Sequence, residues 1–159
     1  TLAFPIERYQ SELLPLVSGA TLVTYLGLAA TLDRLGARRC LLAGGLITAA
    51  VWCGFAALGP SAAQDRLLFS LGVTEAVGLA AGMGALHALL MHEAPTTARA
   101  TFFALSMASI NLGQLVLGPL LGDVLVPALN YRGVFALAAV IHVTAIGVVI
   151  WTGPRRRSL

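Results

Sequence analysis

Charged residues are scarce in this sequence, and lysine is missing altogether. Only 11% of the residues are charged, whereas soluble domains usually contain about a quarter. Apolar residues make up 58% of the chain, and the mean hydropathy is +0.87. A soluble helical domain explains this composition poorly, because several successive full-length apolar runs would have nothing to bury against.

Other patterns are missing too, and each absence excludes a class of protein. The ten basic residues are all arginines at the ends of apolar runs, without the basic stripe and interleaved aromatic residues that would predict nucleic-acid binding. Cys40 and Cys53 lack a metal-ligand spacing. His87 and His92 lack the His-Glu-x-x-His spacing of a membrane metalloenzyme. We therefore expect no enzyme, no metal, no cofactor and no nucleic-acid partner.

What the sequence does contain is a succession of five apolar runs. Crossing a hydrocarbon layer about 30 Å thick takes about 20 such residues. The short alternating segments of a membrane β-barrel are not seen. We predict an all-α, polytopic transmembrane bundle of about five helices, at residues 12–32, 40–58, 66–91, 100–124 and 133–152. Pro15 and Gly19 interrupt the first run, and residues 127–132 form a short loop before the fifth.

Arginine is distributed unequally between the two sides of the predicted bundle. Because connections between crossings alternate sides, one side collects only Arg8, Arg66 and Arg132. The positive-inside rule places the other, richer side in the cytoplasm. That side collects Arg34, Arg38, Arg39, Arg99, Arg155, Arg156 and Arg157. We expect a multi-pass protein of the cytoplasmic membrane, with the lipid bilayer around it.

The connection after the first run reads Asp33-Arg34-Leu35-Gly36-Ala37-Arg38-Arg39. Gly36 would permit a tight turn between antiparallel helices, and the arginines would hold the loop at the anionic inner surface. Asp33 could pair with an arginine or cap a neighbouring helix. The connection resembles the Asp-Arg-x-Gly-Arg-Arg loop of the major facilitator superfamily. A generic basic cytoplasmic loop would explain these residues as well.

Two further segments are similar to this family in the right order. The run from Gly113 to Gly122 resembles the Gly-Pro-x-x-Gly stretch of the fifth or eleventh family helix. The segment from Glu93 to Arg99 resembles the loop that precedes that helix. One helix before the Asp33–Arg39 loop and four after it match family helices two to six or eight to twelve.

We favour helices eight to twelve, which would make the sequence a partial chain without the N-terminal half of the same carrier. Thr74-Glu75-Ala76 stands where the fourth family helix commonly has an arginine and a glycine. Ala29 and Ala37 stand where the first copy of the loop often has glycine and a basic residue. These departures suggest the weaker copy of the loop that is found in the second half.

The resemblance implies a secondary active transporter that moves a small solute across the cytoplasmic membrane by alternating access. The proton is the candidate coupling ion. The alternative is a non-transporting membrane scaffold, receptor or assembly factor of the same fold.

Glu75 is the first candidate for a role in the solute cavity or in coupling, because a carboxylate inside a membrane run should face protein or water. An interfacial glutamate is the alternative, since Arg66 is only nine residues away. Asn111 and Gln114 share a helix face that suits either a solute cavity or close packing. Tyr25 lies mid-helix, where its hydroxyl needs a partner, and is a candidate for cavity lining.

Small residues at helical spacing predict close helix packing instead. Gly78 and Gly82 on the third run form such a pair, and Gly118 and Gly122 form another on the fourth. We interpret His142 on the fifth run as a hydrogen-bonded packing residue, because the twelfth family helix supports the bundle from outside the cavity.

Overall fold

The computed structural model describes residues 6–58 and 65–152, and among them every long element is a helix. The N-terminal segment contains α1 (Ile6–Arg8), the π-helical η1 (Tyr9–Leu13) and α2 (Leu14–Leu35). It is followed by α3 (Ala37–Ala57) and α4 (Asp65–Glu93). The described residues contain no β-strand, in agreement with the predicted all-α fold. The tail arginines at 155–157 lie outside the described residues.

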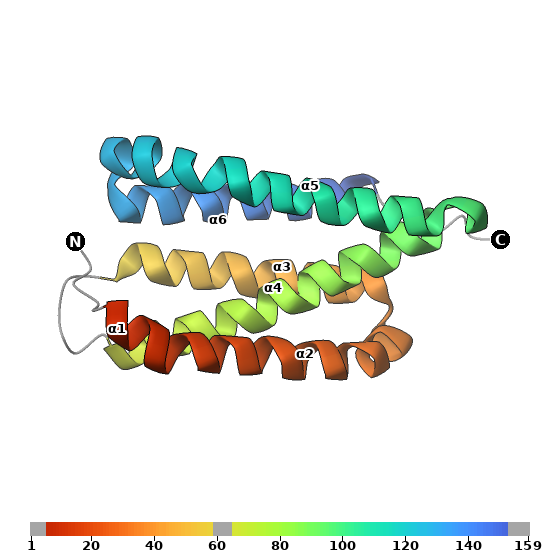
Figure 1. Ribbon diagram of the computed structural model, residues 1–159, viewed down its shortest axis with the longest axis horizontal. Helices are drawn as coiled ribbons and strands as arrows, with labels where there is room; N and C mark the ends of the chain where they lie inside the picture. Colours follow the sequence, from red (N-terminus) through yellow and green to blue (C-terminus); the bar gives the residue numbers. More distant parts are fainter. Residues whose placement is uncertain (1–5, 59–64, 153–159) are drawn as a thin grey trace.

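The C-terminal segment forms one long helical path that reverses direction. It comprises the short 3-10 helix η3 (Thr96–Ala98), α5 (Arg99–Pro119), the π-helical η4 (Leu120–Leu125) and α6 (Val126–Thr152). In Figure 1 the chain runs along α5 in one direction and returns along α6 in the other. Successive long helices therefore run in opposite directions along the bundle, and α4 is inclined to the others (Figure 1).

Four helical stretches of the described residues are long and apolar enough to cross a membrane. They are Tyr9–Leu35, Ala37–Ala57, Arg66–His92 and Thr96–Trp151. The fourth has 56 residues and would be roughly 84 Å long if it were straight, far more than a bilayer needs. Because it turns back at Asn130, it provides two of the antiparallel rods, and about five rods result.

The reversal at Asn130 differs from the loop that we expected at residues 127–132. Asn130 has φ 54° and ψ 171°, but the residues on both sides of it are helical. Its side-chain Oδ1 accepts a hydrogen bond of 3.1 Å from the backbone N–H of Gly133. Asparagine tolerates a positive φ and is a favoured helix N-cap, so one residue can end one helix and start the next. The helical path is consequently longer than the predicted run of 133–152.

The first run also differs from expectation, because α2 is continuous. Pro15 lies at the start of α2, which follows the π-helical η1 directly, so the hydrogen-bond pattern changes just before the proline although the path stays helical. Gly19 leaves the helix intact and has no atom of another residue near the position of a Cβ. The path is therefore helical through both residues, with π-helical geometry just before Pro15 and none at Gly19.

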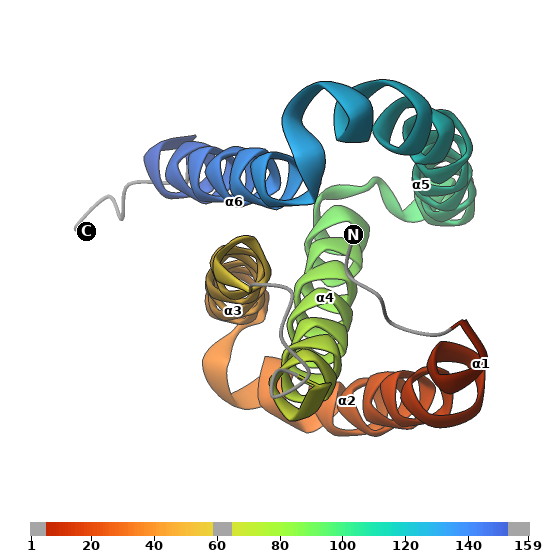
Figure 2. The same ribbon diagram turned by 90° about the vertical axis from the view of Figure 1, so that its left-hand side faces the viewer.

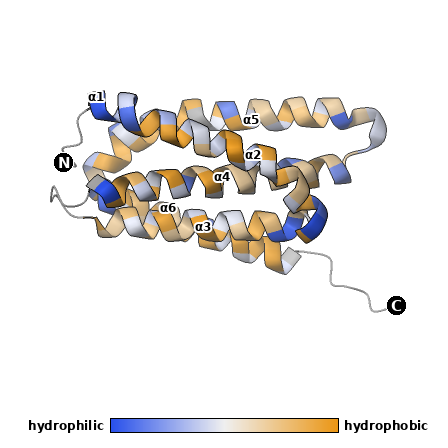
Figure 3. Cartoon of the chain, turned by 90° about the horizontal axis from the view of Figure 1, so that it is seen from below, coloured by the Kyte–Doolittle hydropathy of each residue, from blue (hydrophilic) through white to orange (hydrophobic). Residues whose placement is uncertain are grey.

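The best-packed part of the bundle lies where α3 meets α4 and α6, while α2 packs against the other side of α4. Figure 2 shows α4 between α3 and α2 when the bundle is seen from one end. Thr48 on α3 is only 1% exposed, and the other buried residues of this region are mostly small. Large apolar side chains such as Leu26 and Leu115 are exposed. Figure 3 shows hydrophobic residues along most of every long helix, with hydrophilic residues mainly towards the helix ends. Small residues inside and large apolar residues outside suit a bundle surrounded by lipid, and the chain is an integral multi-pass membrane protein.

Candidate functional site

Gly36 alone separates α2 from α3. Its φ of 81° and ψ of 147° are strained for a residue with a Cβ. Its N–H donates to the carbonyl of Leu32 at 2.8 Å, and its own carbonyl accepts from the N–H of Cys40 at 3.2 Å. Gly36 thus ends one helix and starts the next within a single residue, as its place in the loop motif predicted. We call this end of the bundle the Gly36 end and the opposite one the Asn130 end.

Two arginines fasten α3 to α6 at opposite ends of the bundle. At the Gly36 end, Nη2 of Arg38 donates to the carbonyls of Val149 and Ile150 in the last turn of α6, both at 3.0 Å. At the Asn130 end, Nε of Arg132 donates to the carbonyl of Leu58 that caps α3, at 3.1 Å. A cation near a helix C-terminus satisfies otherwise unpaired carbonyls and complements the helix dipole. Each helix is therefore capped by an arginine from the start of the other.

The remaining charged residues of the loop motif lie apart from this contact. Asp33, Arg34 and Arg39 are exposed, and none of them makes a hydrogen bond or an ion pair with the described part of the chain. Asp33 therefore neither pairs with an arginine nor caps a helix here. The motif contributes a turn at Gly36 and a cap at Arg38, and its other charges face outwards.

A cluster of three side chains, each from a different helix, lies between the Gly36 end and the Asn130 end of the bundle. The indole Nε1–H of Trp52 on α3 donates a hydrogen bond of 2.6 Å to Oε1 of Glu75 on α4. The imidazole of His142 on α6 packs edge-on against the same indole, with ring centroids 4.4 Å apart and an interplanar angle of 67°. Trp52 thus contacts both ionisable side chains of the cluster. All three side chains are half-buried.

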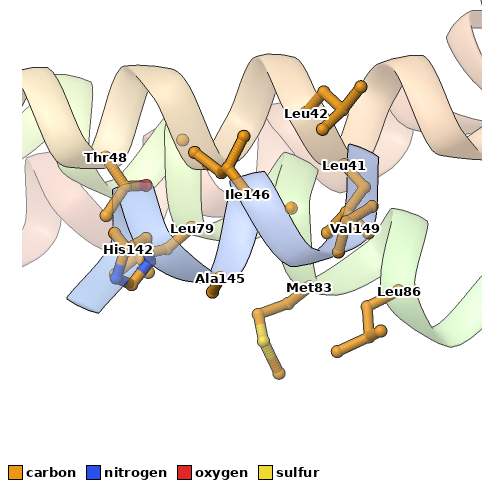
Figure 4. Close-up of a pocket in the computed structure, with 13 residues that line it drawn as sticks. Leu41, Leu42, Thr48, Leu79, Met83, Leu86, His142, Ala145, Ile146 and Val149 are labelled. Carbon is orange, nitrogen blue, oxygen red and sulfur yellow. The ribbon is translucent and has the colours of Figure 1, made fainter. Parts of the chain in front are cut away.

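This cluster lies between two cavities that follow each other along the bundle. Glu75 lines the one towards the Asn130 end, with a volume of about 310 Å³, together with residues of η1, α2, α3 and α6. His142 lines the other, which extends towards the Gly36 end and has a volume of about 250 Å³. Figure 4 shows His142 near Thr48 at one end of that cavity, with Leu42 and Leu86 at the other. Leu79 contributes to both linings and separates the cavities beside the cluster.

Glycines bring α3 and α4 into backbone contact just beside the cluster. A Cβ added to Gly44 would lie 2.5 Å from the backbone N of Gly82 and 2.7 Å from the carbonyl O of Gly78. A Cβ on Gly78 would lie 2.7 Å from Oγ1 of Thr48. Gly78 and Gly82 thus lie at the closest approach of the two helices, opposite Gly44, which the sequence pattern on one run could not indicate. Gly122 has no neighbour within 4 Å of its added Cβ, and the surroundings of Gly118 lie outside what the structure describes.

The other predicted site residues are not brought together with Glu75. Tyr25 is 47% exposed, and its ring lies 3.4 Å from the position of a Cβ on Gly84 of α4. Asn111 is exposed on α5, and the side chain of Gln114 lies outside the described residues. Asn111 and Tyr25 therefore remain separate candidates for solute contact.

Two members of the cluster were not anticipated as site residues. Trp52 lies inside an apolar run five residues before the end of α3, and its indole N–H needs an acceptor there. We expected His142 to be a hydrogen-bonded packing residue, whereas its contacts are with the ring of Trp52 and with the cavity. A polar aromatic residue on the second run and a histidine on the fifth were the available signals. Among the described residues, no three histidine, cysteine or acidic side chains are grouped as metal ligands.

Comparison with known families supports the resemblance seen in the loop and the fourth run. A family model described as Major Facilitator Superfamily matches residues 11–159, which is nearly the whole chain. Searches of curated proteins and of solved structures returned no match.

Proposed function

The chain belongs to the major facilitator superfamily of membrane transporters, and we propose that it moves a small solute by secondary active transport with the proton as the coupling ion. Carriers of this kind expose a site near the bilayer midplane alternately to the two sides of the membrane. The antiparallel helices described above would supply part of the wall of such a site. We also propose that they correspond to family helices eight to twelve, supported by the departures at Ala29 and Ala37.

The observation that carries this proposal is the placement of Glu75. A carboxylate at the centre of a membrane costs roughly 2.5 kcal/mol or more, so its retention in an apolar helix needs a reason. Glu75 points between helices, accepts a hydrogen bond from Trp52 and lines a cavity of about 310 Å³. A carboxylate in that position can bind and release a proton as its access to water changes, which is the chemistry that coupling needs.

We further propose that the Asp33–Arg39 loop lies in the cytoplasm and that the helices cross the cytoplasmic membrane five times. The arginine distribution supports this orientation. The Asn130 end, with the cavity that Glu75 lines, would then face outwards.

A non-transporting scaffold of the same fold is the second candidate. The Trp52–Glu75 hydrogen bond would then be a structural link between α3 and α4, and proton binding would have no consequence.

Solute-driven proton movement separates the two candidates. The full-length protein would be reconstituted into liposomes containing a pH dye, and a panel of amino acids, sugars, peptides, nucleobases and organic cations would be added one at a time. A transporter would show protein-dependent internal pH changes with at least one solute, absent from empty liposomes. A scaffold would give none with any solute, while its loss in cells would disturb the assembly of another membrane component.

A further inference from the structure

Within the proposed function, the structure points to more than one residue at the coupling site. We propose that Trp52 and His142 belong to this site together with Glu75. Trp52 is a positioning residue that holds the carboxylate through its indole N–H. His142 is a second proton-binding group whose charge state is linked to that of Glu75. The role of this site in transport rests on the proposed function. The linkage between the two charges does not, because it can be measured whatever the protein transports.

Trp52 fixes the carboxylate because it supplies the only described hydrogen bond to it. The Nε1 to Oε1 distance is 2.6 Å, and such a bond is stronger when the carboxylate is ionised than when it is neutral. When Glu75 takes up a proton, this bond loses its charge assistance and becomes weaker. Protonation therefore loosens α4 from α3 at this level of the bundle, where the helices otherwise approach closely at Gly44 and Gly78.

His142 responds to the protonation of Glu75, because it contacts the same indole ring. Its ring packs edge-on against Trp52, with ring centroids 4.4 Å apart, and Trp52 in turn donates to Glu75, so the two ionisable groups share one aromatic neighbour. An ionised carboxylate stabilises a nearby imidazolium, so a proton bound by one group weakens the hold of the other on its own proton.

Few other ionisable groups face this pair from the surrounding helices. Tyr9 on η1 shares the cavity that Glu75 lines, and it carries no carboxylate or imidazole. Cys53 follows Trp52 on α3 but is exposed. Tyr25 on α2 lies beside Gly84, two and a half helical turns further along α4. Arg38 binds the carbonyls of α6 at the Gly36 end, away from the cluster.

The two cavities give the paired groups different surroundings. Glu75 borders the cavity at the Asn130 end, which also contains the phenol of Tyr9. His142 borders the other cavity, where the remaining lining is apolar apart from Thr48, whose hydroxyl donates to the carbonyl of Gly44. Each ionisable group thus lines a cavity of its own, Glu75 towards the Asn130 end and His142 towards the Gly36 end.

Trp52 itself provides a spectroscopic probe of the pair. The chain has two tryptophans, and Trp151 at the end of α6 is 79% exposed. The full-length protein in nanodiscs would have Trp151 and any tryptophan outside residues 1–159 replaced by Phe. An imidazolium in contact with an indole quenches its emission, so Trp52 emission should report the charge of His142. Titration would cover about pH 4 to 9, which spans the ordinary ranges of Glu and His.

We expect a two-step emission titration in this single-tryptophan protein. His142→Gln should remove the step that quenches on acidification. Glu75→Gln should remove the other step and move the His142 step to lower pH, because the stabilising carboxylate charge is gone. Glu12→Gln and His92→Gln serve as matched controls, since Glu12 is exposed in a pair with Arg8 and His92 is exposed at the end of α4. Both controls should reproduce the parent curve.

Two results would overturn the inference. If His142→Gln leaves the titration unchanged, His142 does not bind a proton in this range. If Glu75→Gln leaves the His142 step at its original pH, the two groups are not linked. Neither result depends on transport, so a failure of the linkage is distinguishable from a failure of the proposed function.

The positioning role of Trp52 requires a functional readout, namely the pH dependence of solute-driven proton movement. Trp52→Phe keeps an aromatic ring beside His142 but removes the N–H donor to Glu75. It should shift the pH of half-maximal rate while protein yield stays near that of the parent. A purely structural residue would instead lower yield and rate equally at every pH, and that outcome would remove Trp52 from the coupling site.

Discussion

The indole N–H of Trp52 and the carboxylate of Glu75 form a 2.6 Å hydrogen bond across the α3–α4 interface. The two residues are 23 positions apart in the sequence, on two helices that would otherwise present only apolar and small side chains here. The contact turns a costly membrane carboxylate into a positioned acceptor. It also makes Glu75 the residue at which the proposed coupling can be tested most directly.

Glu75→Gln in the full-length carrier should abolish gradient-driven solute accumulation and leave solute exchange closer to normal. Glutamine keeps the size of the side chain and can accept the Trp52 hydrogen bond, but it cannot take up a proton. Exchange of solute for solute need not release that proton. The measurement compares uptake under a pH gradient with counterflow in the same liposomes, and Glu12→Gln is the control. Normal accumulation at every pH would show that Glu75 is not the coupling residue.

Alanine at Gly44 should destabilise the protein much more than alanine at Gly82. The Cβ at Gly44 would lie 2.5 Å from the backbone of Gly82, whereas the Cβ at Gly82 would find its nearest atom at 3.8 Å. The first change forces the helices apart, at a cost of about 1–3 kcal/mol. The second fits an ordinary contact and should be neutral or slightly stabilising, since alanine favours helices over glycine.

Thermal unfolding of the detergent-solubilised protein would measure this pair of substitutions. Gly27→Ala is a further control, because no atom lies within 4 Å of its added Cβ. Equal unfolding temperatures for the Gly44 and Gly82 variants would contradict the close helix approach seen here.

Arg38→Ala should lower stability by about 1 kcal/mol, because two carbonyls of the last turn of α6 lose their donor. Arg39→Ala should change stability by less than about 0.5 kcal/mol, since Arg39 is exposed and has no partner among the described residues. Arg132→Ala removes the cap from α3 and should act like Arg38→Ala.

The double variant of Arg38 and Arg132 tests whether the two caps are independent. They lie at opposite ends of α3, roughly 30 Å apart for a helix of 21 residues, so their effects on unfolding free energy should add. Chemical denaturation in mixed micelles would give the three values. A loss at Arg39 as large as that at Arg38 would mean that general basic charge, and not capping, stabilises this end.

A cysteine at Ala37 should react with an impermeant thiol reagent only after the cells are opened. The positive-inside rule places the Gly36 turn in the cytoplasm. Cys40 and Cys53 would first be replaced by serine or alanine, because Cys53 is exposed. A cysteine at Tyr131, beside the Asn130 break, should react in intact cells. The opposite labelling pattern at the two positions would invert the proposed orientation and place the Glu75 cavity on the inner side.

The sequence by itself determined the class of this protein. Its apolar runs are too long and too many for a soluble core, so the membrane and the helical fold follow from hydropathy alone. The turn at Gly36 was also predictable, because only glycine readily adopts the φ of 81° between two abutting helices. The sequence contained the signal for the Asn130 reversal as well, since asparagine is a favoured N-cap, but the loop reading of residues 127–132 obscured it.

Only the tertiary structure decided which residues meet. An apolar run that will face lipid on one side and protein on the other shows no hydrophobic face, so periodicity could not direct Glu75 towards Trp52 or His142. Arg38 reaches carbonyls 111 and 112 positions away, because α3 and α6 pack antiparallel although two helices separate them in the chain. Gly44 acquires its importance only opposite Gly82. In a bilayer, small residues and polar contacts select the helix neighbours, and these are properties of pairs that no single run displays.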